Sequence, residues 1–348
     1  MYNGIEKAKN LIGKSDMIIL AIESSCDETA AAITCGNKVI SSAIDSQIII
    51  HRKFGGVVPE VASREHTLAA TKVVDEALKK ASLTLKDIDA VAVTYGAGLL
   101  GSLLVGVSTA KALAYSLDIP LIKVNHIEGH ICGVYDSYPD LQPPFMAVVA
   151  SGGHTLLYDV KDFDEYHIMG GTTDDAAGEA FDKVARLLGL PYPGGPEIEK
   201  RGELGEANIN FFKKERHADK ELKLSYSGLK TAVVNYVHNL KQKGEDLPIN
   251  DICASFQKSA VMLLTLAAEE GFKRLGYDKM ILAGGVAANT GLRKSLEDSC
   301  KKLKATLYCP SRSLCTDNAA MIGIRAYYSA LKGKDIADLS LNADSGLL

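Results

Sequence analysis

The order of predicted strands and helices repeats within this chain, and the repeat constrains the fold more than any single motif. Each copy has three strand-like segments, with a polar or glycine turn between the first two, followed by a helix. In the first copy these segments are residues 17–23, 30–34, 38–44 and 60–81. In the second copy they are residues 145–150, 155–160, 165–169 and 175–188. Strand-rich starts followed by strand–helix alternation are typical of layered α/β proteins, so we expect an α/β fold built from two similar halves.

The adjacent prolines Pro143-Pro144 mark the expected boundary between these halves. Two such halves would leave a cleft between them, with the turns aimed into it. The expected segments are an N-terminal extension over 1–16, a first lobe over 17–142, a second lobe over 143–318, and a C-terminal helix and tail over 319–348 packing back across the lobes. A charged stretch around 213–223 is expected to be a linker between helices.

Composition predicts a soluble cytoplasmic protein. The 348 residues suffice for two domains, and no stretch approaches the roughly 18 uninterrupted apolar residues that span a bilayer. Residues 1–16 lack the apolar run of a signal peptide. Seven dispersed cysteines without a C-x-x-C pair suggest reduced thiols. Because the net charge is −4, any contact with RNA would need a local basic patch or a partner.

The segment His126-Ile127-Glu128-Gly129-His130 predicts a metal site. Two histidines four residues apart fall on one face of a helix, close enough to hold one ion. In the metallopeptidase motif H-E-x-x-H the glutamate directly follows the first histidine. Here Glu128 is two positions after His126, about 200° around a helix, and points away from a shared ion. The pattern therefore predicts a metal site and disfavours a peptidase.

Two histidines do not complete a metal site, so a carboxylate is expected from elsewhere in the chain. Thr316-Asp317-Asn318 precedes the last predicted helix. Asp317 is either the third ligand or part of a helix N-cap worth about 1 kcal/mol. Order in the sequence does not decide between these two roles.

Glycine and serine turns after predicted strands indicate a nucleotide site. They are Ser24-Ser25-Cys26-Asp27, Ser151-Gly152-Gly153-His154-Thr155 and Gly284-Gly285-Val286-Ala287-Ala288-Asn289, with Tyr95-Gly96-Ala97-Gly98 a looser match. Such turns can aim backbone N–H groups at phosphate oxygens, although chain geometry alone explains any single one. Their number favours a nucleotide cleft. No segment fits G-x-x-x-x-G-K-[ST], which disfavours a P-loop nucleotide triphosphatase.

A dinucleotide fingerprint competes with this interpretation. Gly96, Gly98 and Gly101 fit G-x-G-x-x-G, after a predicted strand and before a helix. The acid about 20 residues later, Asp118, lies just before Pro120, at the start of the next strand. A ribose-binding acid belongs at the carboxyl end of that strand, so the dinucleotide interpretation is disfavoured.

Several motifs together resemble the bacterial branch of the TsaD family, whose members form threonylcarbamoyladenosine in tRNA. They run in family order from residue 17 to about 330. The matching segments are residues 21–29, 126–130, 151–155, 181–182, 192–196, 225–230, 284–289 and 316–318. The resemblance implies the actin-like ATPase (ASKHA) duplication, with two RNase-H-like lobes around a nucleotide and metal cleft.

The resemblance also implies a set of site residues. His126, His130 and Asp317 would hold one divalent metal, iron or zinc. Some archaeal-type members have a tyrosine ligand at the position of Val149, so a fourth ligand here would be water or the substrate. Glu199 stands where relatives often have aspartate or serine. The implied adenylate and threonylcarbamoyl pocket comprises Val149, Ala150, Ser151, Gly152, Gly153, His154, Thr155, Asp182, Gly195, Glu199 and Asn289.

The implied reaction is acyl transfer of a threonylcarbamoyl group from threonylcarbamoyl-AMP to N6 of the adenosine at tRNA position 37, in tRNAs that read codons beginning with A. Because this amine is a weak nucleophile, transfer needs orientation, proton removal and charge stabilisation. We expect Asp27 or Glu28 to accept the proton. Bacterial members act with TsaB and TsaE, without a membrane.

Two alternatives to this reaction are weighed. One is an ATP-binding scaffold subunit of the modification complex, with little activity alone. The other is an actin-fold phosphotransferase, such as a sugar or acetate kinase. Those enzymes usually carry D-x-G near the start, where this chain has Glu23-Ser24-Ser25, and a kinase would leave the histidine pair unexplained.

Overall fold

The computed structural model describes residues 2–212 and 222–347 and divides into two compact units. The first unit comprises Met1–Gln142 with Pro310–Leu348, and the second comprises Pro143–Cys309. The second boundary differs from the expected one at 318. Residues 310–348 belong to the first unit because helix α12 (Ala319–Leu331) packs on its strands and contributes Met321, Ile322 and Ala326 to its core.

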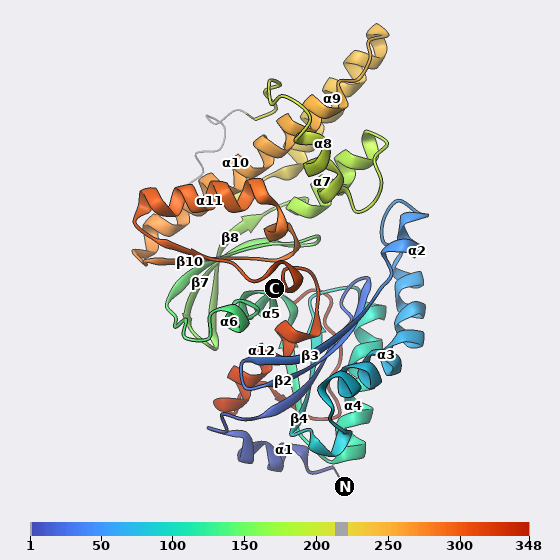
Figure 1. Cartoon of the computed structure of the whole chain (residues 1–348), viewed down its shortest axis with the longest axis vertical. Helices are drawn as coiled ribbons and strands as arrows, with labels where there is room; N and C mark the ends of the chain where they lie inside the picture. The colour runs from blue at the N-terminus through green and yellow to red at the C-terminus, as the bar shows by residue number, and fades with distance from the viewer. Residues whose placement is uncertain (1, 213–221, 348) are drawn as a thin grey trace. The chain divides into compact units, whose positions relative to one another are not determined.

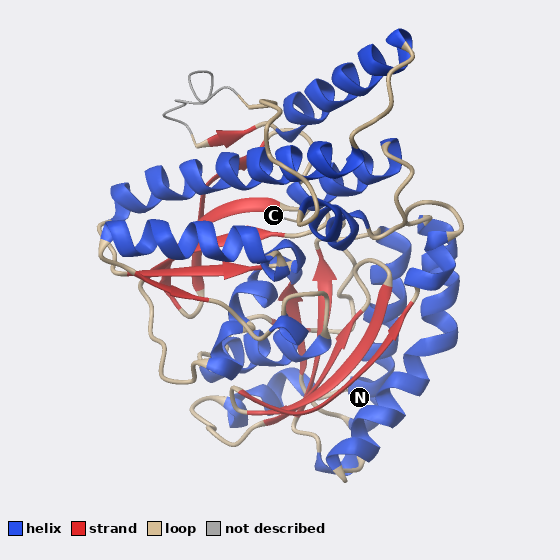
Figure 2. Ribbon diagram, turned by 45° about the horizontal axis from the view of Figure 1, so that its top comes forward, coloured by secondary structure: helices blue, strands red, loops and turns tan. Residues whose placement is uncertain are grey.

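The first unit is built on a six-stranded sheet with the order β12-β5-β4-β1-β2-β3. Its strands are β1 (Ile18–Glu23), β2 (Glu28–Cys35), β3 (Lys38–Ser46), β4 (Ala90–Gly96), β5 (Leu121–Asn125) and β12 (Ile336–Ala337). β1, β4 and β5 run parallel, whereas β2, β3 and β12 pair antiparallel with their neighbours. The central strands are apolar and buried because helices cover both faces of this sheet (Figure 2).

Two groups of helices cover these faces (Figure 1). Alternate residues of β1 divide between two core clusters, Ile19 with α12 and Leu20 with the long helices α3 (Pro59–Ala81) and α4 (Leu100–Leu117). The remaining helices are α1 (Gly4–Lys7), α2 (Ile48–Arg52), α5 (His126–Cys132) and α6 (Val134–Ser137), with 3-10 turns η1 (Ala8–Leu11), η2 (Leu85–Asp87) and η5 (Arg312–Leu314). The predicted N-terminal extension thus forms α1 and η1, and Leu11 is buried in the core.

The second unit repeats this plan with the sheet order β11-β10-β6-β7-β8-β9. Its strands are β6 (Phe145–Ala150), β7 (Thr155–Asp162), β8 (Glu165–Thr172), β9 (Lys223–Leu224), β10 (Lys279–Ala283) and β11 (Thr306–Tyr308). Strands β6, β7, β8, β10 and β11 correspond in order and direction to β1, β2, β3, β4 and β5. The predicted internal duplication is confirmed.

The described residues of the second unit form five α-helices, together with the 3-10 turn η4 (Gly285–Ala288). They are α7 (Ala177–Leu187), α8 (Gly194–Gly202), α9 (Tyr226–Lys243), α10 (Ile249–Leu275) and α11 (Thr290–Leu303). Tyr192-Pro193-Gly194-Gly195-Pro196, whose prolines and glycines are typical of a break in the chain, contains the start of α8. Pro193 is the N-cap and Pro196 lies in the first turn, where a missing backbone N–H costs little. Of the expected linker, residues 213–221 lie outside the described residues and Lys223 begins β9.

By length and composition alone, α4 is the one helix in the described part of the chain apolar enough to cross a membrane. A single helix of this kind is weak support for a membrane span, because core helices pass the same test. α4 packs against α3 and β4, and Leu103, Val107 and Ala110 are buried in that contact region. Its apolar composition therefore has a structural explanation within the first unit.

Candidate metal centre and nucleotide site

His126, His130 and Asp317 come together in the first unit, with one ligand atom from each lying within 4.8 Å of the others. The two histidines face the same side of α5, whose N-terminus is capped by the side chain of Asn125. Asp317 arrives from the loop before α12, and its Oδ1 lies 3.5 Å from His126 Nε2 and 3.1 Å from His130 Nε2. Asn318, not Asp317, caps α12, so the carboxyl of Asp317 is turned toward the histidines.

The donor set and its electrostatics suit a divalent cation. Two imidazoles and one carboxylate leave open positions, as in catalytic zinc sites and ferrous facial triads. Within the described residues, neither ring nitrogen of buried His130 has an assigned hydrogen-bond partner, although Nε2 lies 3.1 Å from Asp317 Oδ1. Burial alone would lower the pKa of His126, but the charges of Glu23 and Asp317 raise it to about 10. The centre therefore favours a positive charge where an ion would sit.

Glu128 lies between the two histidines in sequence but is directed elsewhere. Its Oε2 accepts hydrogen bonds from Arg325 of α12 at 2.7 Å, and Arg325 also contacts Asp335 at 3.3 Å. Arg325 is buried, so this ion pair ties α5 to α12 inside the first unit. Glu128 therefore stabilises the fold, and it does not face the histidines as the general base of a metallopeptidase would.

Glu23, at the end of β1, was not among the site residues expected from the sequence. It is fully buried, and its Oε2 lies 3.0 Å from His126 Nδ1. Thr94 Oγ1 donates to the same carboxyl at 2.6 Å and the backbone N–H of Ser25 donates at 2.5 Å. The sequence indicated a special environment for Glu23 only by placing an acid at the end of an otherwise apolar strand.

Asp27 and Glu28, the expected proton acceptors, lie in the same unit where the turn after β1 leads into β2. Asp27 is buried. Burial, followed by the charges of Asp27 and Asp317, raises the pKa of Glu28 to about 10. This raised pKa disfavours Glu28 as the proton acceptor, so Asp27 is the candidate base that remains of the expected pair.

A buried histidine that the sequence interpretation missed holds this turn in place. His66, on α3, donates from Nε2 to the carbonyl oxygen of Cys26 at 3.0 Å and accepts at Nδ1 from the hydroxyl of Thr29 at 2.7 Å. Burial lowers the pKa of His66, so the imidazole is neutral and can serve both as donor and as acceptor. The backbone on both sides of Asp27 is thus fixed from α3.

In the second unit, the turn between β6 and β7 lies against the N-terminus of α7. Ser151 N–H donates to His154 O at 2.8 Å, which closes the turn. Gly178 N–H and Glu179 N–H donate to Ser151 O and Gly152 O, both at 3.1 Å. Thr155 Oγ1 accepts from Ala177 N–H at 2.8 Å. These bonds fix the serine and glycine turn to the start of α7 and satisfy the first three backbone N–H groups of that helix.

At four glycines of this unit, neither the backbone conformation nor the packing of the chain requires glycine. Among the glycines whose surroundings are described, only Gly152, Gly153, Gly195 and Gly285 combine an ordinary φ with open space, since a Cβ there would meet nothing within 4 Å. They come from the turn after β6, the start of α8 and the turn after β10. Glycines that neither backbone angle nor packing requires are expected where a ligand approaches the backbone.

Comparison with known proteins identifies the family. Residues 38–324 match the family model described as tRNA N6-adenosine threonylcarbamoyltransferase (TsaD). This chain belongs to the TsaD family. A protein of that name from Clostridium novyi (strain NT) is 54% identical over 330 residues, covering 94% of this chain and 96% of the relative. One from Clostridioides difficile (strain 630) is 50% identical, covering 94% and 97%.

Solved structures show the fold. Full-length HypF, in a phosphate- and nucleotide-bound form, superposes with a TM-score of 0.60 at 16% identity, over 91% of this chain and 47% of HypF. Component A of the Acidaminococcus fermentans (R)-2-hydroxyglutaryl-CoA dehydratase gives 0.55 at 16% identity, over 90% and 99%. The fold is the actin-like ATPase duplication, as the resemblance implied.

Three polar residues expected in the TsaD pocket also hold the second unit together. Asp182 Oδ1 accepts from Gly194 N–H at 2.6 Å, joining α7 to the start of α8. Glu199 Oε1 accepts from Thr290 N–H at 2.7 Å, and Asn289 Oδ1 accepts from Leu292 N–H at 2.9 Å, so both support the start of α11. These contacts place the three side chains on α7, α8 and the turn before α11.

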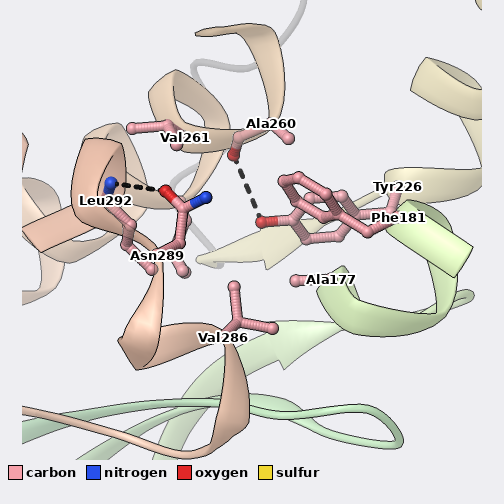
Figure 3. Close-up of a pocket in the computed structure, with 9 residues that line it drawn as sticks. Ala177, Phe181, Tyr226, Ala260, Val261, Val286, Asn289 and Leu292 are labelled. Carbon is pink, nitrogen blue, oxygen red and sulfur yellow. Dashed lines mark hydrogen bonds between the residues drawn. The ribbon is translucent and has the colours of Figure 1, made fainter. Parts of the chain in front are cut away.

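A small pocket adjoins Asn289 in this unit (Figure 3). Its other walls are mainly apolar, with Phe181 and Tyr226 on one side and Val286 below, and the Tyr226 hydroxyl donates to Ala260 O at 3.3 Å. Val149 and Ala150 are fully buried in β6. If Val149 and Ala150 contact a ligand as expected, they would do so through backbone atoms at the end of the strand.

The glycines of the rejected dinucleotide fingerprint have structural explanations. A Cβ on Gly96 would lie 2.2 Å from Asp344 O, and one on Gly98 would lie 2.5 Å from Ser25 O. Asp118, the acid tested for ribose binding, instead ends α4 and forms an ion pair with Lys7 at 2.8 Å. Close packing within the first unit explains the G-x-G-x-x-G spacing.

Proposed function

We propose that this chain transfers the threonylcarbamoyl group from threonylcarbamoyl-AMP to N6 of the adenosine at tRNA position 37, in tRNAs that read codons beginning with A. The observation that carries the proposal is the centre of His126, His130 and Asp317 in a chain of the TsaD family. The four open glycines of the second unit support it, because an acyl-adenylate donor needs a place for its phosphate.

His126, His130 and Asp317 would hold one divalent cation, Fe²⁺ or Zn²⁺. The bound ion would supply Lewis acidity toward phosphate and carbonyl oxygens. In the second unit, backbone N–H groups at the Ser151 turn and at η4 would hold the ATP-derived AMP moiety. Asn289 and Glu199 would keep the start of α11 in position for that contact.

The chain's own acid–base group is Asp27. The N6 amine must lose a proton as the carbamoyl carbon is attacked, and AMP leaves with the electron pair of the broken mixed-anhydride bond. Asp27 would accept that proton. His66 would hold the turn so that the Asp27 carboxylate stays oriented. Protonated Glu28 would act beside it as a hydrogen-bond donor.

The proposed partners are tRNA, TsaB as a heterodimer partner and TsaE, acting in the cytoplasm. Exposed apolar side chains support a protein partner at the packed helices α3 and α4, since Leu68, Leu100 and Leu104 are 62%, 51% and 40% exposed. A partner would also offset the net charge of −4, which disfavours binding of tRNA by this chain alone. An ATP-binding scaffold with little activity of its own is the second candidate.

A product assay tests the proposal. Purified protein with TsaB, TsaE, ATP, threonylcarbamoyl-AMP and unmodified tRNA is expected to yield modified adenosine by nucleoside mass spectrometry. A His126→Ala, His130→Ala variant should give none. His167→Ala, at a 51%-exposed histidine on β8, serves as the matched control and should retain product. No product from wild type that retains metal and adenylate would favour the scaffold.

A further inference from the structure

Glu23 is a buried carboxylate to which the proposed transfer reaction assigns no role. We propose that Glu23 is the positioning residue of the metal centre, orienting His126 toward the ion and supplying the second negative charge that balances a divalent cation. This inference rests on the proposed function only in requiring that the centre hold a divalent cation.

The orientation follows from which nitrogen of His126 faces which acid. Nδ1 lies 3.0 Å from Glu23 Oε2, whereas Nε2 lies 3.5 Å from Asp317 Oδ1. A carboxylate accepts only, so the imidazole donates from Nδ1, and when an ion displaces the second proton the ring would offer the lone pair of Nε2. A carboxylate behind a ligating histidine fixes the ring and raises the basicity of the nitrogen that faces the metal.

Glu23 is itself held in place, which a positioning group requires. Thr94 Oγ1 on the neighbouring parallel strand β4 donates to Oε2 at 2.6 Å, and the Ser25 backbone N–H donates to Oε1 at 2.5 Å. The side chain is 0% exposed, so no water shell competes with these bonds. Both oxygens are therefore fixed by strands β1 and β4 and the turn between β1 and β2.

Charge balance points to the same role. Glu23 and Asp317 together carry two negative charges, and no lysine or arginine in residues 2–212 and 222–347 forms an ion pair with either. The buried Arg325 is committed to Glu128 and Asp335. Buried charges are normally paired or bound to metals, and one divalent cation neutralises this pair of carboxylates with two neutral imidazoles.

Among the described residues, no carboxylate accepts a hydrogen bond from Nδ1 of His130 as Glu23 does from Nδ1 of His126. In the part of the chain that the structure describes, Nδ1 of His130 has no hydrogen-bond partner, so one histidine of the centre is oriented by a carboxylate and the other is held by packing. Removing the Glu23 charge should therefore weaken metal binding without removing any ligand.

Metal affinity, measured without tRNA or nucleotide, tests the inference. Zn²⁺ is titrated into the full chain against a chromophoric chelator. Glu23→Gln is expected to weaken Zn²⁺ binding about 10- to 100-fold, the range found for groups that orient metal ligands. The Co²⁺-loaded variant should also show a shifted visible absorption band. Glu165→Gln, which alters a half-exposed acid on β8 of the second unit, should leave affinity and spectrum unchanged.

A second measurement keeps the inference testable if Glu23→Gln does not fold. In Zn²⁺-loaded wild type labelled with ¹⁵N-histidine, His126 should carry its proton on Nδ1 and the metal on Nε2. Zn²⁺ bound at Nδ1, or a folded Glu23→Gln with wild-type Zn²⁺ affinity, would overturn the inference. An inactive wild type whose Zn²⁺ affinity still depends on Glu23 would refute the transfer reaction and leave the role of Glu23 standing.

Discussion

The two candidate sites are built by opposite means. In the first unit, a metal centre forms from buried side chains that carry charge, and each acid is held by specific hydrogen bonds or ion pairs. In the second unit, the candidate nucleotide site is made of backbone turns in which four glycines leave space open. The first site should therefore fail when charge is removed, and the second should fail when volume is added.

The largest expected effect comes from removing charge at the metal centre. Asp317→Asn keeps the size of the side chain but removes a ligand charge, so we expect metal content near zero and product formation reduced at least about 100-fold. Metal analysis of the purified variant and the product assay provide the measurements.

The neighbouring residue gives a matched control for that loss. Asn318→Ala removes the N-cap of α12, which should lower the free energy of unfolding by about 1 kcal/mol while metal content stays near wild type. If Asp317→Asn retained its metal and only Asn318→Ala lost it, the loop before α12 would be a capping element and not part of a centre.

A smaller effect is expected from adding volume in the second unit. Gly285→Ala places a methyl group in open space, so we expect little change in the free energy of unfolding and roughly tenfold weaker adenylate binding by calorimetry. Gly194→Ala is the contrasting variant, because its methyl group would lie 2.5 Å from Ala185 Cβ and should destabilise the fold. Unchanged adenylate affinity in Gly285→Ala would mean that the open space faces solvent only.

A pH-dependent effect distinguishes the two acids of the first turn. The pKa of Glu28 is about 10 in the folded chain and about 4.3 in an unfolded one, so its proton stabilises the fold fully below pH 4.3. That stabilisation is lost as pH rises toward 10. Glu28→Gln keeps a neutral side chain, so in metal-free protein its free energy of unfolding should not fall with pH, whereas that of wild type should fall by about 1.4 kcal/mol per pH unit between pH 5.5 and 8.5. Denaturant unfolding at several pH values measures the difference, and parallel curves would show that Glu28 is ionised.

The smallest effect is expected at Glu199, which has two possible roles. Glu199→Gln retains an oxygen for Thr290 N–H but loses the charge at the start of α11, so the free energy of unfolding should fall by about 0.5 kcal/mol. Adenylate affinity should change less than threefold if Glu199 mainly supports this helix. A tenfold loss of affinity would instead place its carboxylate against the ligand.

The contrast between a site made of distant side chains and a site made of local turns also explains which features the sequence could predict. Local patterns in the sequence predicted the duplicated strand order, the histidine pair and the glycine turns, because each of these features depends on residues close together in the chain. Glu23 and His126 are 103 positions apart, and no periodicity links them. Strands β9, β11 and β12 are two or three residues long, too short for any period, and pair only because longer strands are already in place. Pro193 and Pro196 suggested a break where they begin a helix.

The chain order of the two units has a consequence for protein synthesis. The second unit is one continuous segment, Pro143–Cys309, whereas the first is complete only when Pro310–Leu348 has been made. Translation therefore delivers every residue of the second unit while the first still lacks α12 and β12. Asp317 arrives with that last segment, so a nascent chain can close the proposed metal centre only after the whole second unit has been made. Truncated chains from interrupted translation would lack the centre, however well their remaining residues folded.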